Sequence, residues 1–142
     1  MKTMLNPFKS LSFLLLVFAT LTFTSCDKDD VKTPLTESIE GVWDVTSYKL
    51  EGDEYIGLIF EEAVLGFEAT VDNEGVFTQE VTFTDDETVF ITGPYVVDEE
   101  ENDVYMEYDG EVIVAHIEIN DGKMVWDGTQ DGFPLVLKAT RR

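Results

Sequence analysis

This chain of 142 residues has little of the chemistry that most metal-binding and catalytic proteins use. It contains one cysteine, Cys26, and one histidine, His116, so it can build neither an internal disulfide nor a zinc site with several histidine ligands. Basic residues are also scarce: nine lysines and arginines stand against thirty aspartates and glutamates, and the net charge is −21. Because phosphate recognition needs a basic surface, this balance argues against a nucleic-acid partner.

A long apolar segment is missing as well. The most apolar stretch runs from Leu11 to Phe23, which is shorter than the about 20 residues that a membrane-spanning helix needs. Lys2 and Lys9 precede this stretch, and small residues follow it directly before Cys26. This order is typical of a secretory signal peptide, so we predict that residues 1–25 are an export signal. A cysteine at the cleavage site indicates a lipoprotein signal, and Cys26 is the predicted lipidation site.

The segment Phe23-Thr24-Ser25-Cys26 resembles a bacterial lipobox, and Lys28-Asp29-Asp30 resembles the surface-export signal of Bacteroidota-type lipoproteins. The resemblance implies a protein held by lipid on Cys26 at the outer membrane and exposed on the cell surface. Residues 26–38 are predicted to be the lipidated cysteine and an acidic tether. Two alternatives stay open: a solvated tether without an export role, and an ordinary secretory signal with a chance cysteine.

Residues 39–142 are predicted to form one all-β domain. Apolar and polar residues alternate along most of this region, as expected for strands that bury one face. Most connections are too short for the crossovers that parallel strands need, so successive strands are predicted to pair antiparallel. Closing such a meander gives an eight-stranded up-and-down barrel without exposed edges. The predicted strands are Gly41–Leu50, Gly66–Val71, Val76–Thr84, Thr88–Val97, Asp103–Tyr108, Glu111–Ile119, Lys123–Trp126 and Leu135–Thr140.

One hairpin gives an internal check on this prediction. Asp109-Gly110 favours a two-residue turn with positive φ at both residues. Such a turn sets Tyr108 opposite Glu111 and Met106 opposite Ile113, and opposed residues share a face. Alternation independently places Met106 and Ile113 on the inner face, so the two arguments agree on the register.

A few segments interrupt the alternation. Five apolar residues of Glu51–Leu65 recur at helical spacing, which predicts a short helix or lid between the first two strands; an extension of a strand is the alternative. Gly93-Pro94 predicts a kink or bulge. The Asp-Gly pairs at 121–122, 127–128 and 131–132 predict further turns.

Several short motifs resemble the lipocalin-like domains of Bacteroidota lipoproteins. Gly41-Val42-Trp43 resembles the Gly-x-Trp that opens lipocalins, and the stretch 135–141 resembles the end of these domains. Asn73-Glu74-Gly75 with the following Val-Phe-Thr, and Gly93-Pro94-Tyr95, resemble the family's internal strand motifs. The resemblance implies a lipocalin-like barrel. It also implies that Arg141 crosses the face of Trp43 and closes the base, which is a structural role.

The barrel interior is the predicted site. The functional interpretation is an apolar cup for a small hydrophobic molecule, and the alternative is a filled core that only supports outer loops which bind a protein or glycan. No cofactor or metal is predicted, and the oligomeric state stays open. The residues predicted to contact a ligand are Phe67, Phe77, Phe83, Met106, Ile113, Trp126 and Leu137.

Other candidate chemistry is weak, so we expect a protein that is not an enzyme and has no catalytic residues. Alternation places His116 on the outer face, and the hairpin register sets Asp103 opposite it, which predicts a surface pair. The acidic runs 85–87 and 98–103 lack the spacing of a calcium-binding loop and are predicted to be solvated turns.

Overall fold

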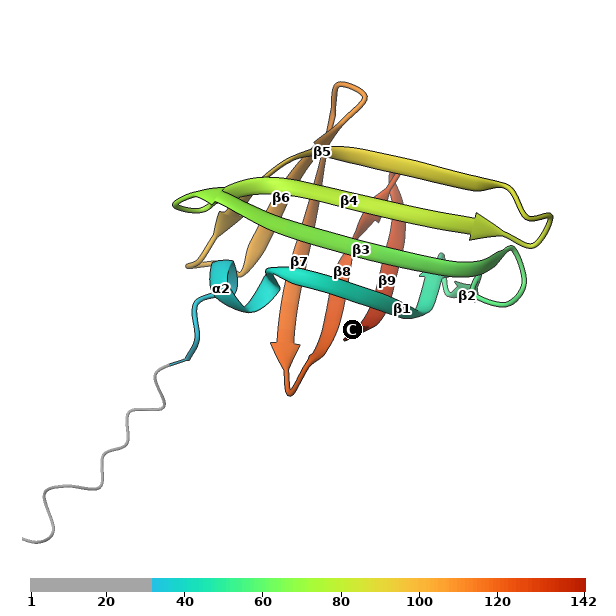
Figure 1. Cartoon of the computed structure of the whole chain (residues 1–142), viewed down its shortest axis with the longest axis horizontal. Helices are drawn as coiled ribbons and strands as arrows, with labels where there is room; N and C mark the ends of the chain where they lie inside the picture. The colour runs from blue at the N-terminus through green and yellow to red at the C-terminus, as the bar shows by residue number, and fades with distance from the viewer. Residues whose placement is uncertain (1–31) are drawn as a thin grey trace, which may run out of the picture. The chain divides into compact units, whose positions relative to one another are not determined.

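The structure is a computed structural model of the chain, and it describes residues 32–142. The predicted signal peptide, Cys26 and the part of the predicted tether up to residue 31 lie outside these residues. The elements, shown in Figure 1, are α2 (Leu35–Ile39), β1 (Gly41–Leu50), β2 (Asp53–Glu54), β3 (Phe60–Val71), β4 (Glu74–Phe83), β5 (Thr88–Asp98), β6 (Asp103–Tyr108), β7 (Glu111–Asn120), β8 (Lys123–Gln130) and β9 (Phe133–Arg141).

The strands form one closed antiparallel barrel. Each long strand pairs with the next one along the chain, and pairing between β1 and β9 closes the circle. The two-residue strand β2 pairs antiparallel with the last two residues of β1. In Figure 1, strands β3 to β5 run across the view and β7 to β9 cross behind them. The predicted all-β, eight-stranded, lipocalin-like barrel is therefore confirmed for the described part of the chain.

The turns follow the predicted chemistry with one exception. Asp109 and Gly110 have φ of 51° and 80°, and the pairs at 121–122 and 131–132 are likewise positive. Tyr108 pairs with Glu111 and Met106 with Ile113, which confirms the predicted register of this hairpin. The predicted turn at Asp127-Gly128 is wrong, because β8 continues through both residues and pairs with β7 and β9.

The segment Glu51–Leu65 is not helical, so the predicted helix or lid is wrong and the strand alternative is correct from Phe60 onward. The reason is a register shift in β3 between Phe60 and Glu62. Phe60 pairs with Phe83 and Ala63 with Val81, so residues three apart in the sequence face the same side. This spacing imitates one turn of a helix.

The described residues contain one helix, and it precedes β1. In α2, Leu35 is 5% exposed and Ile39 is fully buried in the barrel's core, so the folded domain begins before the predicted boundary at residue 39. The carboxylate of Glu99, in the β5–β6 loop, accepts hydrogen bonds from the backbone N–H groups of Leu35 and Thr36, both at 2.7 Å. Part of the predicted tether is therefore a helix that packs against one end of the barrel, called the closed end below.

The closed end is built around Trp43, which is fully buried. Its indole Nε1 donates to the Ile39 carbonyl at 2.8 Å, and the Arg141 guanidinium carbon lies 4.6 Å from the centre of its ring. Arg141 also donates to the carbonyls of Ser38 and Glu40 at 2.5 and 2.8 Å. The contact that the resemblance implied between Arg141 and Trp43 is thus present. The hydrogen bonds of these two residues tie the first and last strands to the end of α2 and to Glu40.

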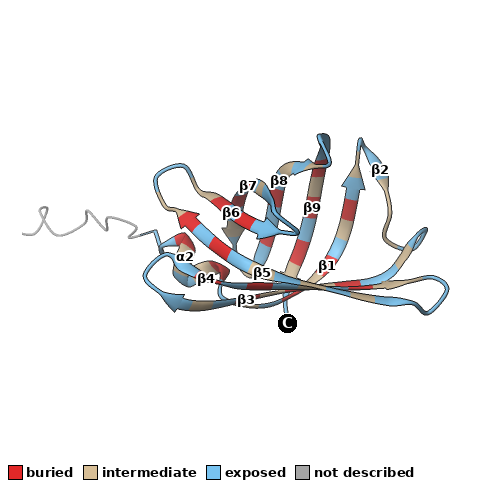
Figure 2. Ribbon diagram, turned by 90° about the horizontal axis from the view of Figure 1, so that it is seen from above, coloured by how far each residue is buried: buried red, intermediate tan, exposed pale blue. Residues whose placement is uncertain are grey.

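The interior is formed by one face of every long strand, as the alternating buried and exposed bands in Figure 2 show. The predicted inward residues Trp43, Phe67, Phe77, Met106, Trp126 and Leu137 are all at most 5% exposed, whereas Phe83 and Ile113 are half-buried. Strong alternation therefore identified most of the core correctly.

One strand is paired along only part of its length. Strand β5 pairs with β4 throughout, without a register shift at Gly93-Pro94, so a bulge in that ladder is absent. Its pairing with β6 begins only at Tyr95, so residues 88–94 have no ladder partner on that side. The backbone N–H of Val97 donates to the Asn73 carbonyl, which lies on the β4 side of β5. Backbone N–H groups alternate sides along a strand, so the N–H of Ile91 also faces β4, whereas those of Phe90 and Thr92 face the unpaired side.

Candidate functional site

A cavity of about 330 Å³ occupies the end of the barrel opposite the closed end. Its walls come from strands β1 and β3 to β9, so it lies inside the barrel and not on its surface. The deeper lining is apolar and the outer lining is polar. The apolar lining residues are Leu65, Phe77, Ile91, Met106, Ile113, Trp126, Leu135 and Leu137, and the polar ones are Tyr48, Gln79, Tyr108, Asp109, Glu111, Gln130 and Asp131.

Five of the seven residues predicted to contact a ligand line this cavity: Phe77, Met106, Ile113, Trp126 and Leu137. The other two lie elsewhere. Phe67 packs edge-on against Tyr95 near the closed end, with ring centres 5.4 Å apart. Phe83 contacts Phe60 edge-on at 5.2 Å, in an aromatic cluster that also contains Tyr48 and Tyr55.

Sequence reasoning missed Tyr48, which is 4% exposed and lines the cavity. Alternation from Trp43 and Val45 places it on the outer face, but a register shift between Val45 and Ser47 turns it inward. Its hydroxyl is hydrogen-bonded to the Gln130 side-chain oxygen. Burial, with a smaller contribution from the negative charge of Asp131, raises the pKa of Tyr48 to about 12. The phenol is therefore a neutral group at the top of the cavity.

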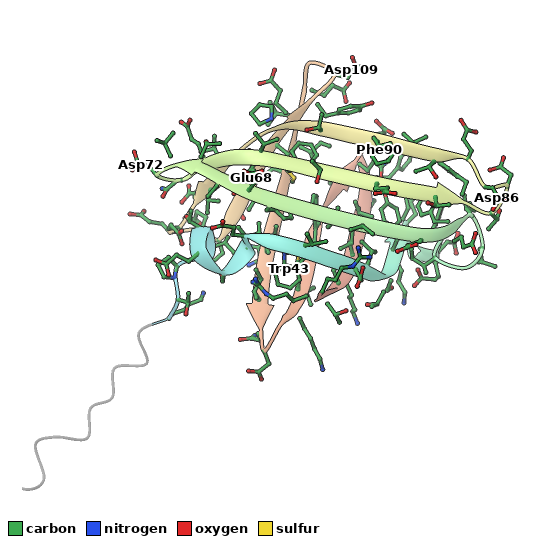
Figure 3. All side chains as sticks on the ribbon, in the orientation of Figure 1. Trp43, Glu68, Asp72, Asp86, Phe90 and Asp109 are labelled. Atoms are coloured by element: carbon green, nitrogen blue, oxygen red, sulfur yellow. The ribbon has the colours of Figure 1, made fainter. Side chains whose placement is uncertain are left out.

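The polar lining residues gather at the mouth. Asp109 lies in the β6–β7 turn, Glu111 is the first residue of β7, and Asp131 lies in the β8–β9 turn; all three are exposed. Figure 3 shows Asp109 at the tip of its hairpin, well away from Trp43 at the closed end. These carboxylates were not among the predicted site residues, because alternation identifies only the apolar interior.

One donor in the described lining of the cavity has no partner. Trp126 lines the cavity and is 5% exposed, and its indole Nε1 lacks a hydrogen-bond acceptor among the described residues. A Cβ on Gly128 would lie 3.0 Å from this nitrogen. Gly128 is the next residue of β8 after Trp126 that faces inward, on the side of the mouth, so the indole nitrogen lies beside Gly128. A buried donor without a partner is uncommon in native proteins, and a bound molecule with an acceptor would satisfy it.

Other candidate groups stay apart from the cavity. His116 Nδ1 lies 3.0 Å from Asp103 Oδ1 on the outer face, which confirms the predicted surface pair. Glu99, in one of the acidic runs, caps α2. Among residues 32–142, no cluster of three or more histidine, cysteine or carboxylate side chains could hold a metal ion. None of the helices in that part of the chain could cross a membrane.

Comparison with known proteins supports the fold. No protein-family model and no curated protein matches the sequence. Among solved structures, a redesigned β-barrel aligns with a TM-score of 0.61 at 15% identity, covering 78% of this chain and 97% of the designed one. A de novo designed fluorescence-activating β-barrel aligns with a TM-score of 0.57 at 11% identity, covering 78% and 99%. The redesigned barrel mFAP1, bound to DFHBI, aligns with a TM-score of 0.54 at 12% identity, covering 78% and 100%.

These likenesses define the class of fold: a small, closed, eight-stranded antiparallel β-barrel. Identities between 11% and 15% carry no information on what this chain binds. The cavity and its lining residues are therefore the basis for the function proposed below.

Proposed function

We propose that this protein is a lipid-anchored binding protein whose barrel holds a small, largely apolar molecule in its cavity. The observation that carries the proposal is the cavity itself. Its volume of about 330 Å³ lies within the range of about 300–1,000 Å³ that small-molecule sites occupy. A filled core would have closed this space. In this proposal the barrel is not an enzyme, and its negative charge disfavours a nucleic-acid partner.

The unpartnered Trp126 N–H supports the same proposal, and the designed barrel bound to DFHBI is an example of this class of fold with a small-molecule ligand. An apolar wall with a few polar groups near the opening is the usual composition of a small-molecule pocket. The ligand's body would lie against Phe77, Met106 and Leu137, and its polar end would lie at the mouth.

The test is a titration of the purified protein with Nile red, a neutral apolar dye, together with two matched variants. Ile113→Phe places extra volume in the cavity, and Val112→Phe places the same ring one residue earlier on the outer face, where Val112 is 63% exposed. Ile113→Phe should weaken binding by about tenfold, since overpacking costs about 1–3 kcal/mol. Val112→Phe should bind like the unsubstituted protein. Absence of dye binding by the unsubstituted protein would contradict the proposal.

An interaction module is the second candidate, favoured by an apolar row on the outer face. Val96 pairs with Tyr105, and Tyr105 pairs with Val114. Their exposed fractions are 45%, 39% and 39%. Adjacent exposed apolar side chains often mark a protein-binding surface. Under this alternative, Tyr105→Glu would abolish partner binding and leave dye binding unchanged. Ile113→Phe would weaken dye binding and leave partner binding unchanged.

The proposed location is the outer membrane, with the domain on the cell surface and lipid on Cys26 as its anchor. Two or more acyl chains make such an anchor stable. In a Gram-negative host, Cys26→Ser should move the protein from the membrane fraction to the soluble fraction. Mass spectrometry of the N-terminal peptide should detect acyl chains only on the unsubstituted protein. An unmodified cysteine would overturn this part of the proposal and leave the ligand-binding part standing.

A further inference from the structure

The cavity is lined by charges of one sign. Asp109, Glu111 and Asp131 are the ionisable residues of its outer lining that are charged at neutral pH, and none of the lining residues is basic. All three are exposed, so water solvates them when no ligand is present.

Among residues 32–142, no basic side chain forms an ion pair with Asp109, Glu111 or Asp131, and Lys49, an exposed residue at the mouth end of β1, acts on Glu54. Arg141 donates to backbone carbonyls at the closed end, and Arg142 pairs with Asp44 and Glu62 at 2.5 and 3.3 Å. Lys123 begins β8 at the closed end as well. The negative charge at the mouth also acts inside the barrel, because Asp131 contributes to the raised pKa of Tyr48.

The inner part of the cavity requires a different chemistry from the mouth. Below the carboxylates the walls are largely aliphatic and aromatic, and the Trp126 N–H over Gly128 is the buried donor of the described lining that has no partner. The volume of about 330 Å³ lies at the small end of the range of small-molecule sites, which suits a short amphipathic molecule. Such a molecule has its apolar body inside and one polar end among the carboxylates.

We propose that the cavity selects amphipathic molecules whose polar end is a cation, such as a protonated amine, and rejects those whose polar end is a carboxylate. This inference rests on the proposed function and specifies its ligand class. An exposed ion pair shifts an equilibrium by a factor of about 1.4 to 5. Three carboxylates attract an amine and repel an acid, so the ratio of the two affinities should be about tenfold or more.

The experiment compares octylamine, octanol and octanoate, which share one apolar chain and differ in the charge of the polar end. Binding to the purified protein is followed at neutral pH by calorimetry and by displacement of Nile red. The expected order of affinity is octylamine, then octanol, then octanoate. Raising the salt from about 0.1 to 1 M shortens the screening length from about 10 to 3 Å and should bring the amine and the acid close together.

Two triple variants isolate the charge of the mouth. The first is Asp109→Asn, Glu111→Gln and Asp131→Asn, and it should reduce the preference for octylamine over octanoate to less than about threefold. The control is Asp72→Asn, Glu74→Gln and Asp121→Asn, which removes the same charge from equivalent turn and strand-start positions at the closed end. Asparagine tolerates the positive φ at all four aspartates, so the two variants are matched in backbone chemistry.

The control should keep the preference of the unsubstituted protein. If octanoate binds as tightly as octylamine, or if both triple variants change the preference equally, the inference is overturned while octanol binding still supports the proposed function. If none of the three compounds and no Nile red binds, the proposed function itself fails.

Discussion

Replacing Trp43 with alanine tests whether the closed end holds the barrel together. The ring is fully buried, donates to the Ile39 carbonyl at 2.8 Å and lies under Arg141 at 4.6 Å. Trp43→Ala removes all three interactions at once. It leaves a cavity in the core, a carbonyl without its donor and a guanidinium without its ring.

The expected loss of stability follows from these three contributions. Truncating a buried aromatic residue to alanine costs about 3–5 kcal/mol, and losing a hydrogen bond adds about 1 kcal/mol. Arg141 is exposed, so its contact with the ring adds only about 0.5–1 kcal/mol. The three contributions total about 4.5–7 kcal/mol. The free energy of unfolding of a small domain is about 5–15 kcal/mol, so this loss removes a large part of the stability.

Urea unfolding followed by far-ultraviolet circular dichroism measures this loss. The midpoint should fall by at least about 1 M urea for Trp43→Ala. Trp43→Phe keeps most of the ring and should lose about half as much, and it should still bind Nile red, because Trp43 does not line the cavity. A loss below about 1 kcal/mol for Trp43→Ala would refute the structural role of this residue.

Three further predictions concern other parts of the domain. Glu99→Gln should lower the free energy of unfolding by about 1–2 kcal/mol in urea titrations, because the carboxylate caps two N–H groups of α2; an unchanged midpoint would contradict this. The pKa of Tyr48 rises from 10.0 to about 12 on folding, so the unfolded chain releases the phenol proton first and the unfolding free energy should fall by up to about 2–3 kcal/mol above pH 10. Tyr48→Phe should flatten this decline, and equal slopes for both proteins would disprove it. In hydrogen exchange, the amide of Phe90 should exchange faster than that of Ile91, since only the latter faces β4; equal protection would mean that the β5 edge is covered.

The fold was predictable where the two-residue periodicity is unbroken. The β6–β7 hairpin shows this best, because Asp109-Gly110 and the alternation of Met106 and Ile113 specify the same register. Turn chemistry and side-chain pattern are both local properties, so a single sequence contains them. The closed barrel followed from short connections between such strands.

Two of the errors in the prediction share one physical cause, which is a β-bulge. The shift between Phe60 and Glu62 makes a strand imitate helical spacing, and the shift between Val45 and Ser47 brings Tyr48 into the cavity. A bulge depends on the partner strand, so it leaves no reliable mark in the sequence of one strand. The capping of α2 by Glu99 is hidden for the same reason, since 64 residues separate Glu99 from Leu35.

The position of α2 has a mechanical consequence for an anchored protein. The chain enters the barrel at the end farthest from Asp109, Glu111 and Asp131, so any pull from the N-terminal side is applied there. The first contacts to bear that force are the bonds from Glu99 and the packing of Leu35, because β1 is held by strands on both of its sides. Helix α2 would detach before the strands separate, and the mouth of the cavity would keep its shape while the force acts.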